Sequence, residues 1–453
     1  MTSLDALRDR VSGPVLTPDD PGFAEEVAGF NVAVTDRPDI VVGVTSADDV
    51  REAVRFASDE RMPVRVRATG HGAHHPISDG MLLNTKRLND VTVDAQSRMA
   101  SIGAGAQWHE VQAVASPLGL SAIPGSSMTV GAVGYTLGGG LGPLARSHGF
   151  TSDHVRGFEV VTAGGDLVNA SSTSHPELFW ALRGGKGGLG VVTSMQIELV
   201  ELATIYAGSL FFAEEYIERV LRGWVAWTRS ADDGVTTSAA IVNFPDFESV
   251  PPPLRGQRAL SLRFAYPGDP VDGARLAEPL RALAPTIVDA VGPLPTANLG
   301  QIHNDPEEPG PIWYRGMLVD AIDDDFVTEL LSRVGAGTSA PLVVSEVRHL
   351  GCATRTDVAG GSAVGGRASD FTLGFIGAPN PGLFDHVLPA FADELTAALS
   401  PWVSTETTVN FAPDAATMDE LARAWPREIH ERLQAARALY DPHSLFTYVP
   451  SSD

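Results

Sequence analysis

The stretch from Gly125 to Gly142, GSSMTVGAVGYTLGGGLG, constrains the fold of this chain more than any other segment. Seven of its eighteen residues are glycine, and its apolar residues follow neither a helical nor a strand period. Glycine at this density marks a backbone that another group approaches closely. Backbone N–H groups in such a loop form concavities that suit a pyrophosphate. We therefore predict a ligand-binding loop without regular structure, with a purely structural loop as the alternative.

A second glycine cluster, GGKGGLG at 184–190, matches the G-x-G-x-x-G pattern through Gly185, Gly187 and Gly190. A dinucleotide site of the Rossmann type needs a strand before the glycines and a helix after them. Here the helix-like HPELFWALR comes first and the strand-like GVVTSMQIELV follows. The reversed order argues against a nicotinamide cofactor and leaves a helix-to-strand turn as the simple alternative.

The segment RATGHGAHHP follows a short predicted strand, PVRVR. His71, His74 and His75 have a spacing that could bind zinc on a helix. Gly70 and Gly72 disfavour that helix, as does the proline that follows. We therefore predict a loop at a strand end and no metal.

The remaining pattern predicts an α+β fold. We expect a helix over 46–60 capped by Ser46, hairpins over 91–105 and 158–170, and a helix over 108–115. Beyond about residue 200, helical stretches near 214–230, 270–283, 324–334 and 382–399 alternate with strand-like runs. This alternation predicts an antiparallel sheet covered by helices. The sequence pattern over 427–440 predicts a last helix.

Composition limits the partners. The net charge of −24 excludes a nucleic-acid partner and disfavours an anionic membrane, because both need clustered Lys and Arg. A neutral or cationic small molecule fits this charge better. The single cysteine, Cys352, excludes an intramolecular disulfide. No signal-like or membrane-spanning run is present, so we expect a cytoplasmic protein, either monomeric or homodimeric.

The glycine loop, RATGHG and GGKGGLGVVTS occur in an order that resembles the PCMH-type FAD-binding domain of the vanillyl-alcohol-oxidase superfamily, in its berberine-bridge-enzyme-like branch. The C-terminal TVNFAPD…LYDPHSLF is similar to the segment of that branch that returns to cover the flavin. The resemblance implies a two-part FAD-binding domain over 1–200, an α+β substrate domain over 201–404 and a returning segment over 405–453.

The resemblance also implies where FAD is held, with a covalent bond from His71 to the 8α-methyl carbon of the flavin. The cofactor-binding residues that it implies are Arg67, Ala68, Thr69, Gly70, His71, Gly72, Gly125, Ser126, Thr129, Val130, Gly131, Gly134, Tyr135, Gly138, Gly139, Gly142, Gly190, Val192 and Asn410.

Two departures from the branch matter. Many relatives carry a second flavin bond from a cysteine in G-x-C-x-x-V-G, and Ser127 stands at that position here. We therefore expect one covalent link and no cysteinyl link. Sugar-oxidising relatives often have Tyr-x-Asn-Tyr near the C-terminus, whereas this chain has Thr408-Val409-Asn410-Phe411. The phenol that assists proton removal in those relatives is absent.

Glu346 is the predicted catalytic base. In PLVVSEVRHLG, strand alternation places Glu346 and Arg348 on one face and His349 on the other. The alternative is that Glu346 only pairs with Arg348 or another nearby charge. His349 is the second candidate, and His303 is predicted in a surface loop. Tyr135 is the second predicted catalytic residue, expected to touch the flavin ring, with simple packing beneath the flavin as the alternative.

The predicted function is FAD-dependent oxidation of an alcohol or C–H bond in a small organic substrate, through hydride transfer to flavin N5. Family analogy favours a natural-product pathway of secondary metabolism. Val130 favours O2 as electron acceptor, because relatives carry a small residue there. Trp313, Tyr314 and Arg315 could line an aromatic substrate pocket, although core packing is the favoured explanation for Trp313. The alternatives are an oxygenase acting on a polyketide-like substrate, and a flavin-binding protein or cyclase without redox turnover.

Overall fold

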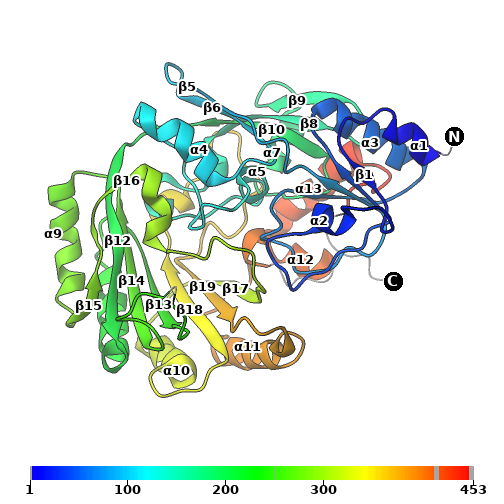
Figure 1. Cartoon of the computed structure of the whole chain (residues 1–453). Coiled ribbons are helices and arrows are strands. Elements are labelled where there is room, and N and C mark those ends of the chain that lie inside the picture. Colours follow the sequence, from blue (N-terminus) through cyan, green and yellow to red (C-terminus); the bar gives the residue numbers. More distant parts are fainter. Residues whose placement is uncertain (1–2, 249, 413–417, 448–453) are drawn as a thin grey trace.

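A computed structural model describes residues 3–248, 250–412 and 418–447, which form four β-sheets with helices around them (Figure 1). The predicted α+β class is confirmed. Within these ranges, no helix combines the length and the apolar character needed to cross a membrane.

The first sheet has the strand order β1-β2-β4-β3, and its last three strands are parallel. The predicted helix that follows Ser46 is confirmed, since the Ser46 side chain accepts a hydrogen bond from the Asp49 N–H. The elements are α1 (Ser3–Arg8), β1 (Val15–Leu16), α2 (Phe23–Val27), β2 (Ile40–Gly43), α3 (Ala47–Asp59), β3 (Val64–Arg67) and β4 (Met81–Asn84).

The second sheet is antiparallel, with the order β5-β6-β10-β8-β9. Both predicted hairpins are present in it. Its elements and those packed on it are β5 (Val91–Asp94), β6 (Met99–Gly103), α4 (Trp108–Ala115), β7 (Leu120–Ser121), α5 (Ala132–Thr136), α6 (Ala145–His148), β8 (Val155–Val161), β9 (Leu167–Ser171), α7 (Pro176–Leu182) and β10 (Val191–Glu198). A two-stranded sheet pairs β7 with β11 (Val200–Glu201).

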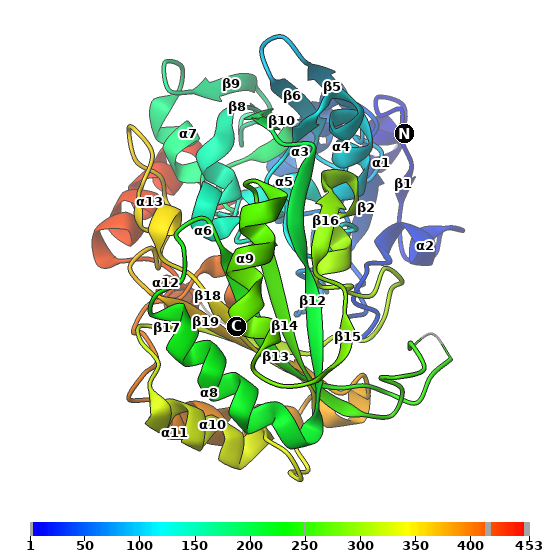
Figure 2. The ribbon, with the colours of Figure 1, turned by 90° about the vertical axis from the view of Figure 1, so that its left-hand side faces the viewer.

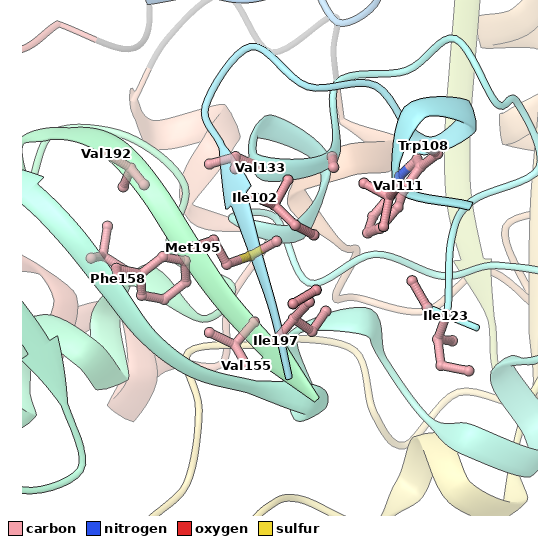
Figure 3. Packing of buried hydrophobic residues seen from close by; sticks show 14 of the residues in the cluster. Ile102, Trp108, Val111, Ile123, Val133, Val155, Phe158, Val192, Met195 and Ile197 are labelled. Carbon is pink, nitrogen blue, oxygen red and sulfur yellow. The ribbon is translucent and has the colours of Figure 1, made fainter. Parts of the chain in front are cut away.

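The largest hydrophobic core lies against this second sheet (Figure 3). Ile102, Phe158 and Met195 project from three neighbouring strands, and Trp108 of α4 is fully buried beside them. The Trp108 ring meets the Tyr135 ring edge-on, with centroids 5.9 Å apart. The core therefore supports the glycine-rich segment from behind.

The short helix α5 lies inside the stretch for which the sequence predicts no regular structure, so that prediction is wrong for five residues. Ala132 and Val133 are buried in the core, and the Thr136 hydroxyl donates to the Ala132 carbonyl at 2.7 Å. Tertiary packing thus overrides a sequence without helical periodicity.

The third large sheet has eight antiparallel strands in the order β15-β12-β14-β13-β18-β19-β17, with β16 also paired to β12. Its helices cover one face (Figure 2). The strands are β12 (Thr204–Ala213), β13 (Thr236–Asn243), β14 (Arg258–Tyr266), β15 (Thr286–Asp289), β16 (Gly292–Pro295), β17 (Tyr314–Val319), β18 (Leu342–His349) and β19 (Phe371–Gly377). The helices are α8 (Ile217–Thr228), α9 (Pro270–Arg281), α10 (Asp324–Val334) and α11 (Val387–Ala398).

The two faces of this sheet differ because successive side chains alternate. Leu262 and Val347 point into the core beneath the helices. Their neighbours Arg263, Glu346 and Ser238 lie on the opposite face and are buried. The sheet therefore has an apolar face under its helices and a polar inner face that is also covered.

The C-terminal part returns to the first half of the chain after α12 (Met418–Ala422) and α13 (Arg427–Tyr440). Phe446 forms a parallel bridge with Val64 of β3 and packs in its core. In α13, Arg432 pairs with Glu177 of α7 at 2.8 Å. This course is compatible with the predicted returning segment, while the predicted domain limits stay a prediction.

We predict that Trp108→Ala destabilises the protein by about 3–5 kcal/mol, since it removes a fully buried aromatic ring and leaves a cavity. Urea unfolding followed by circular dichroism measures the loss. Val114→Ala is the control, because Val114 is exposed on the same helix and should change stability by less than about 0.5 kcal/mol. Equal losses in the two variants would contradict the proposed support by this core.

Candidate active site

A cavity of about 560 Å³ is lined by four separate parts of the chain and by the inner face of the eight-stranded sheet. Its volume is in the range of roughly 300–1,000 Å³ that small-molecule and cofactor sites occupy. The four parts are the end of β3 with the loop to Ile77, the glycine-rich loop, the turn before β10, and the C-terminal segment around Asn410.

Most of the residues predicted to hold the cofactor line this cavity. Those that do are Arg67, Ala68, Thr69, Gly70, His71, Gly72, Gly125, Ser126, Val130, Gly131, Gly134, Tyr135, Gly138, Gly190, Val192 and Asn410.

Three predicted residues, Thr129, Gly139 and Gly142, are not in the cavity wall. Thr129 contacts His71 instead. The two glycines serve packing, because a Cβ on Gly142 would lie 1.9 Å from the Pro124 carbonyl oxygen and one on Gly139 would lie 3.1 Å from the Phe150 ring. Glycine at these positions lets the loop fold closely on itself.

His71 is held on three sides. Its Nδ1 lies 2.9 Å from the Thr69 hydroxyl and its Nε2 lies 3.1 Å from the Thr129 hydroxyl. Phe30 stacks on the ring, with centroids 3.7 Å apart. Burial lowers the pKa of His71 to about 4, so the ring is neutral near pH 7 and keeps a nitrogen lone pair.

Ser127 extends this chain of hydroxyls. Its Oγ lies 3.2 Å from the Thr129 hydroxyl, and Ser127 itself lines the cavity. The position at which relatives of the predicted branch carry a second covalent link is therefore at the cavity wall and holds an oxygen.

Arg67 has a different role from that of a ligand-binding cation. Its guanidinium is buried, pairs with Asp36 and donates to the Val27 carbonyl at 2.9 Å. This pair anchors the end of β3, from which the loop with His71 begins.

Lys186 connects three parts of the cavity wall. Its Nζ donates to the Gly134 carbonyl at 2.9 Å and to Asn410 Oδ1 at 2.8 Å. Asn410 Nδ2 in turn donates to the Tyr135 carbonyl at 2.9 Å. Burial lowers the pKa of Lys186 to about 8. Lys186 was not predicted as a site residue, although a charged residue inside a glycine turn is a visible signal.

The phenol of Tyr135 is buried, and burial raises its pKa. The ring packs against Gly125 and Gly140, where a Cβ would lie 3.0 and 2.5 Å from its carbons. Tyr135 also lines the cavity, as expected for a residue that touches a bound ring.

Glu346 lies on the inner face of the sheet, next to the cavity wall. Its Oε1 accepts from the Ser238 hydroxyl at 2.7 Å and from Arg263, and its Oε2 accepts from Arg348 Nε at 2.8 Å. Arg348 lines the cavity, whereas Glu346 does not. The observed contacts are those of the alternative in which Glu346 pairs with Arg348.

The charges around Glu346 set its protonation. Burial raises the pKa of this carboxyl group, but Arg348 and Arg263 lower it by more, so its pKa lies well below the ordinary value. A carboxylate with such a low pKa is a weak proton acceptor at neutral pH.

Both histidines near Glu346 are buried, which corrects the predicted surface position of His303. His303 Nε2 lies 3.5 Å from Glu346 Oε1, and burial lowers the pKa of His303. His349 is on the opposite face, as predicted. It stacks on Phe371 and bonds to Arg146.

The wall opposite the glycine loop is mostly apolar. Tyr314 of the predicted aromatic cluster contributes to it, whereas Trp313 packs against the core of the sheet and Arg315 pairs with Asp393. Distant strands and loops bring the other members together, so their place in this wall was not predicted: Ile312, Arg348, Ile376 and Phe411.

The residues present fit FAD. Within the described residues, the backbone N–H groups of His71 and Gly72 have no acceptor, and they are available to an anionic group such as pyrophosphate. A Cβ on Gly72 or Gly134 would meet only open space. In the same part of the chain, no three His, Cys, Asp or Glu side chains gather as a metal site would require.

Comparison with known proteins agrees with this geometry. Residues 38–171 match the family model described as FAD binding domain. The chain is 32% identical over 242 residues to (R)-6-hydroxynicotine oxidase of Paenarthrobacter nicotinovorans, which covers 52% of this chain and 50% of that protein. The chain thus spans about half the length of the curated relatives it matches.

Solved structures share the fold over nearly the whole chain. The structure of 6-hydroxy-D-nicotine oxidase from Arthrobacter nicotinovorans has a TM-score of 0.82 at 23% identity, covering 96% of each chain. That of glucooligosaccharide oxidase from Acremonium strictum, described with a 6-S-cysteinyl, 8α-N1-histidyl FAD, has a TM-score of 0.83 at 20% identity, covering 99% of this chain and 98% of that one. Residues 38–171 are thus similar to the FAD binding domain family, and the chain as a whole has the fold of these two solved oxidases.

Proposed function

We propose that this protein is an FAD-linked oxidase that removes two electrons from an alcohol or C–H bond of a small organic substrate. The observation that carries the proposal is one cavity with the FAD-binding loops on one side and the inner face of the eight-stranded sheet on the other. FAD bound there would take up the two electrons and pass them to O2. The sheet side offers Tyr314, Arg348 and Ile376 to the substrate.

His71 is the proposed site of covalent attachment. Its ring is neutral at pH 7, and the two threonine hydroxyls and Phe30 fix its orientation. Because Ser127 lines the cavity and carries no thiol, the proposal includes a single histidyl link. The doubly linked FAD of glucooligosaccharide oxidase would differ in this respect.

Tyr135 and Glu346 have distinct proposed roles. Tyr135 packs in the glycine-rich part of the cavity wall, and burial raises the pKa of its phenol further above neutral pH. Glu346 was predicted as the base, but both of its oxygens are bound and its pKa lies well below the ordinary value. We infer that Glu346 is a positioning residue, which holds Arg348 at the cavity.

The oxygenase and the redox-silent flavoprotein remain distinguishable alternatives. Labelled O2 yields labelled peroxide and unlabelled product with an oxidase, and labelled product with an oxygenase. A cyclase without redox turnover releases no peroxide and leaves the flavin absorbance unchanged when substrate is added anaerobically.

We predict that acid precipitation leaves FAD on the protein, so that the precipitated chain is yellow and its intact mass is greater by one FAD. His71→Ala should release all FAD into the supernatant, since no other residue is proposed to form a bond. His74→Ala is the control, because His74 also lines the cavity and has no proposed link. Free FAD from the unmodified protein would overturn the covalent link, and no flavin in either fraction would overturn the function.

We predict that Glu346→Gln lowers kcat/KM mainly through a higher KM, by about tenfold, because a misplaced Arg348 binds substrate less well. Peroxide release with an alcohol found active in a substrate screen is the measurement. The matched control is Ser127→Ala, which also removes a polar group but from the wall formed by the glycine-rich loop. A fall in kcat of about 10²–10⁴ with unchanged KM, and a changed pH profile, would instead identify Glu346 as the base.

A further inference from the structure

The inner face of the eight-stranded sheet carries an excess positive charge beside the cavity. Arg263 and Arg348 share the single carboxylate of Glu346. Pairing places Ser238 opposite both Arg263 and Arg348 on the neighbouring strands, so the two guanidinium groups flank one strand. The nearby His303 adds no charge, because burial lowers its pKa. The group of two arginines and one glutamate therefore has a net charge of about +1.

Arg348 presents this charge to the cavity. Its Nε is occupied by Glu346 at 2.8 Å, whereas its two terminal nitrogens donate to no acceptor among the described residues. The side chain is 23% exposed, and it lines the cavity. Asp305 raises the pKa of Arg348 through its field, but no ion pair joins Asp305 to Arg348 in the described chain. One edge of a partly buried guanidinium is thus fixed, and its other donors are available to a ligand.

The geometry points to a substrate that carries a carboxylate, and we propose that Arg348 binds this group while Glu346 holds the guanidinium in place. Two terminal N–H groups of a guanidinium match the two oxygens of a carboxylate. The other side chains on the Arg348 side of the cavity wall are largely apolar: Ile312, Tyr314, Ile376 and Phe411. The substrate class is therefore an organic acid with an apolar or aromatic body. This inference rests on the proposed function and names its substrate class.

The neutral polyol is the competing class, and the cavity favours it less. A sugar needs many hydrogen-bonding groups and gains nothing from an unbalanced charge. Arg348 shares the Glu346 carboxylate with Arg263, so its remaining donors gain most from an anionic ligand.

The test compares a carboxylate with its neutral amide. FAD-loaded protein is titrated with benzoate and with benzamide, and binding is measured by calorimetry and by the change in the flavin spectrum. We expect benzoate to bind at least about tenfold more tightly. Arg348→Gln should abolish this preference. Arg348→Lys should retain only part of it, because lysine keeps the positive charge but lacks the two paired N–H donors of a guanidinium. Arg355→Gln is the matched control, since Arg355 is 48% exposed and pairs with Asp370.

Each other outcome overturns the inference in a recognisable way. Equal affinity for benzoate and benzamide in the unmodified protein excludes an anion site. A preference that survives in Arg348→Gln places the anion elsewhere. Loss of FAD from a folded Arg348→Lys protein, judged by far-ultraviolet circular dichroism, assigns Arg348 to the cofactor instead.

The result that contradicts the proposed function differs from the result that contradicts the carboxylate site. Protein that contains no FAD contradicts the proposed function, and calorimetry still reports whether it prefers benzoate. Protein that contains FAD but shows no preference contradicts only the carboxylate site.

Discussion

The ammonium group of Lys186 joins the parts of the chain that surround the cavity. Gly134, Lys186 and Asn410 are far apart in sequence, and the two hydrogen bonds from Nζ bring them together. Lys186 has a positive φ of 62°, a conformation that is unfavourable for a residue with a side chain. Gly138 allows the contact, because a Cβ there would lie 2.1 Å from Asn410 Oδ1. The glycine loop, the turn before β10 and the C-terminal segment thus depend on one buried cation.

The eight-stranded sheet imposes a second constraint. Strand alternation gives it two buried faces, and the helices α8 to α11 cover only the apolar one. Several polar groups of the inner face therefore bond to one another. Ser238, Arg263 and Arg348 all do so through Glu346. A carboxylate that accepts hydrogen bonds from three donors has mainly a structural role. Strand alternation predicted the face on which Glu346 lies, but it could not reveal these three partners and hence the role of Glu346.

Local patterns predicted much of this protein. The cap at Ser46, the helix from Trp108 to Ala115 and the shared face of Glu346 and Arg348 follow from spacing that is visible in the sequence. The segments around Gly70 and Gly134 were expected to hold a ligand because glycine density indicates close approach of the backbone, and both line the cavity.

What escaped prediction depends on contacts between distant segments. The segment after Ile302 is polar and rich in proline, yet the His303 side chain is only 5% exposed and lies 3.5 Å from Glu346. The Ser209 hydroxyl of β12 donates to the neighbouring Ile302 carbonyl at 2.7 Å. Gly139 and Gly142 resemble their neighbours in sequence, and only the positions of Phe150 and Pro124 reveal that they serve packing. Arg348 was visible beside Glu346, but its free donors could be recognised only once the other strands were in place.

The net charge of the chain and the local charge at Arg348 predict opposite charges for the substrate. The distance over which each charge acts decides between the two predictions. The chain carries −24, which favours a neutral or cationic ligand. Exposed charges more than about 8 Å apart are largely screened at physiological ionic strength. Inside the cavity, the guanidinium of Arg348 acts at contact distance and in a less polar surrounding, where its field is several times stronger than in water. The acidic surface therefore governs how an anion approaches, while Arg348 governs whether it stays bound.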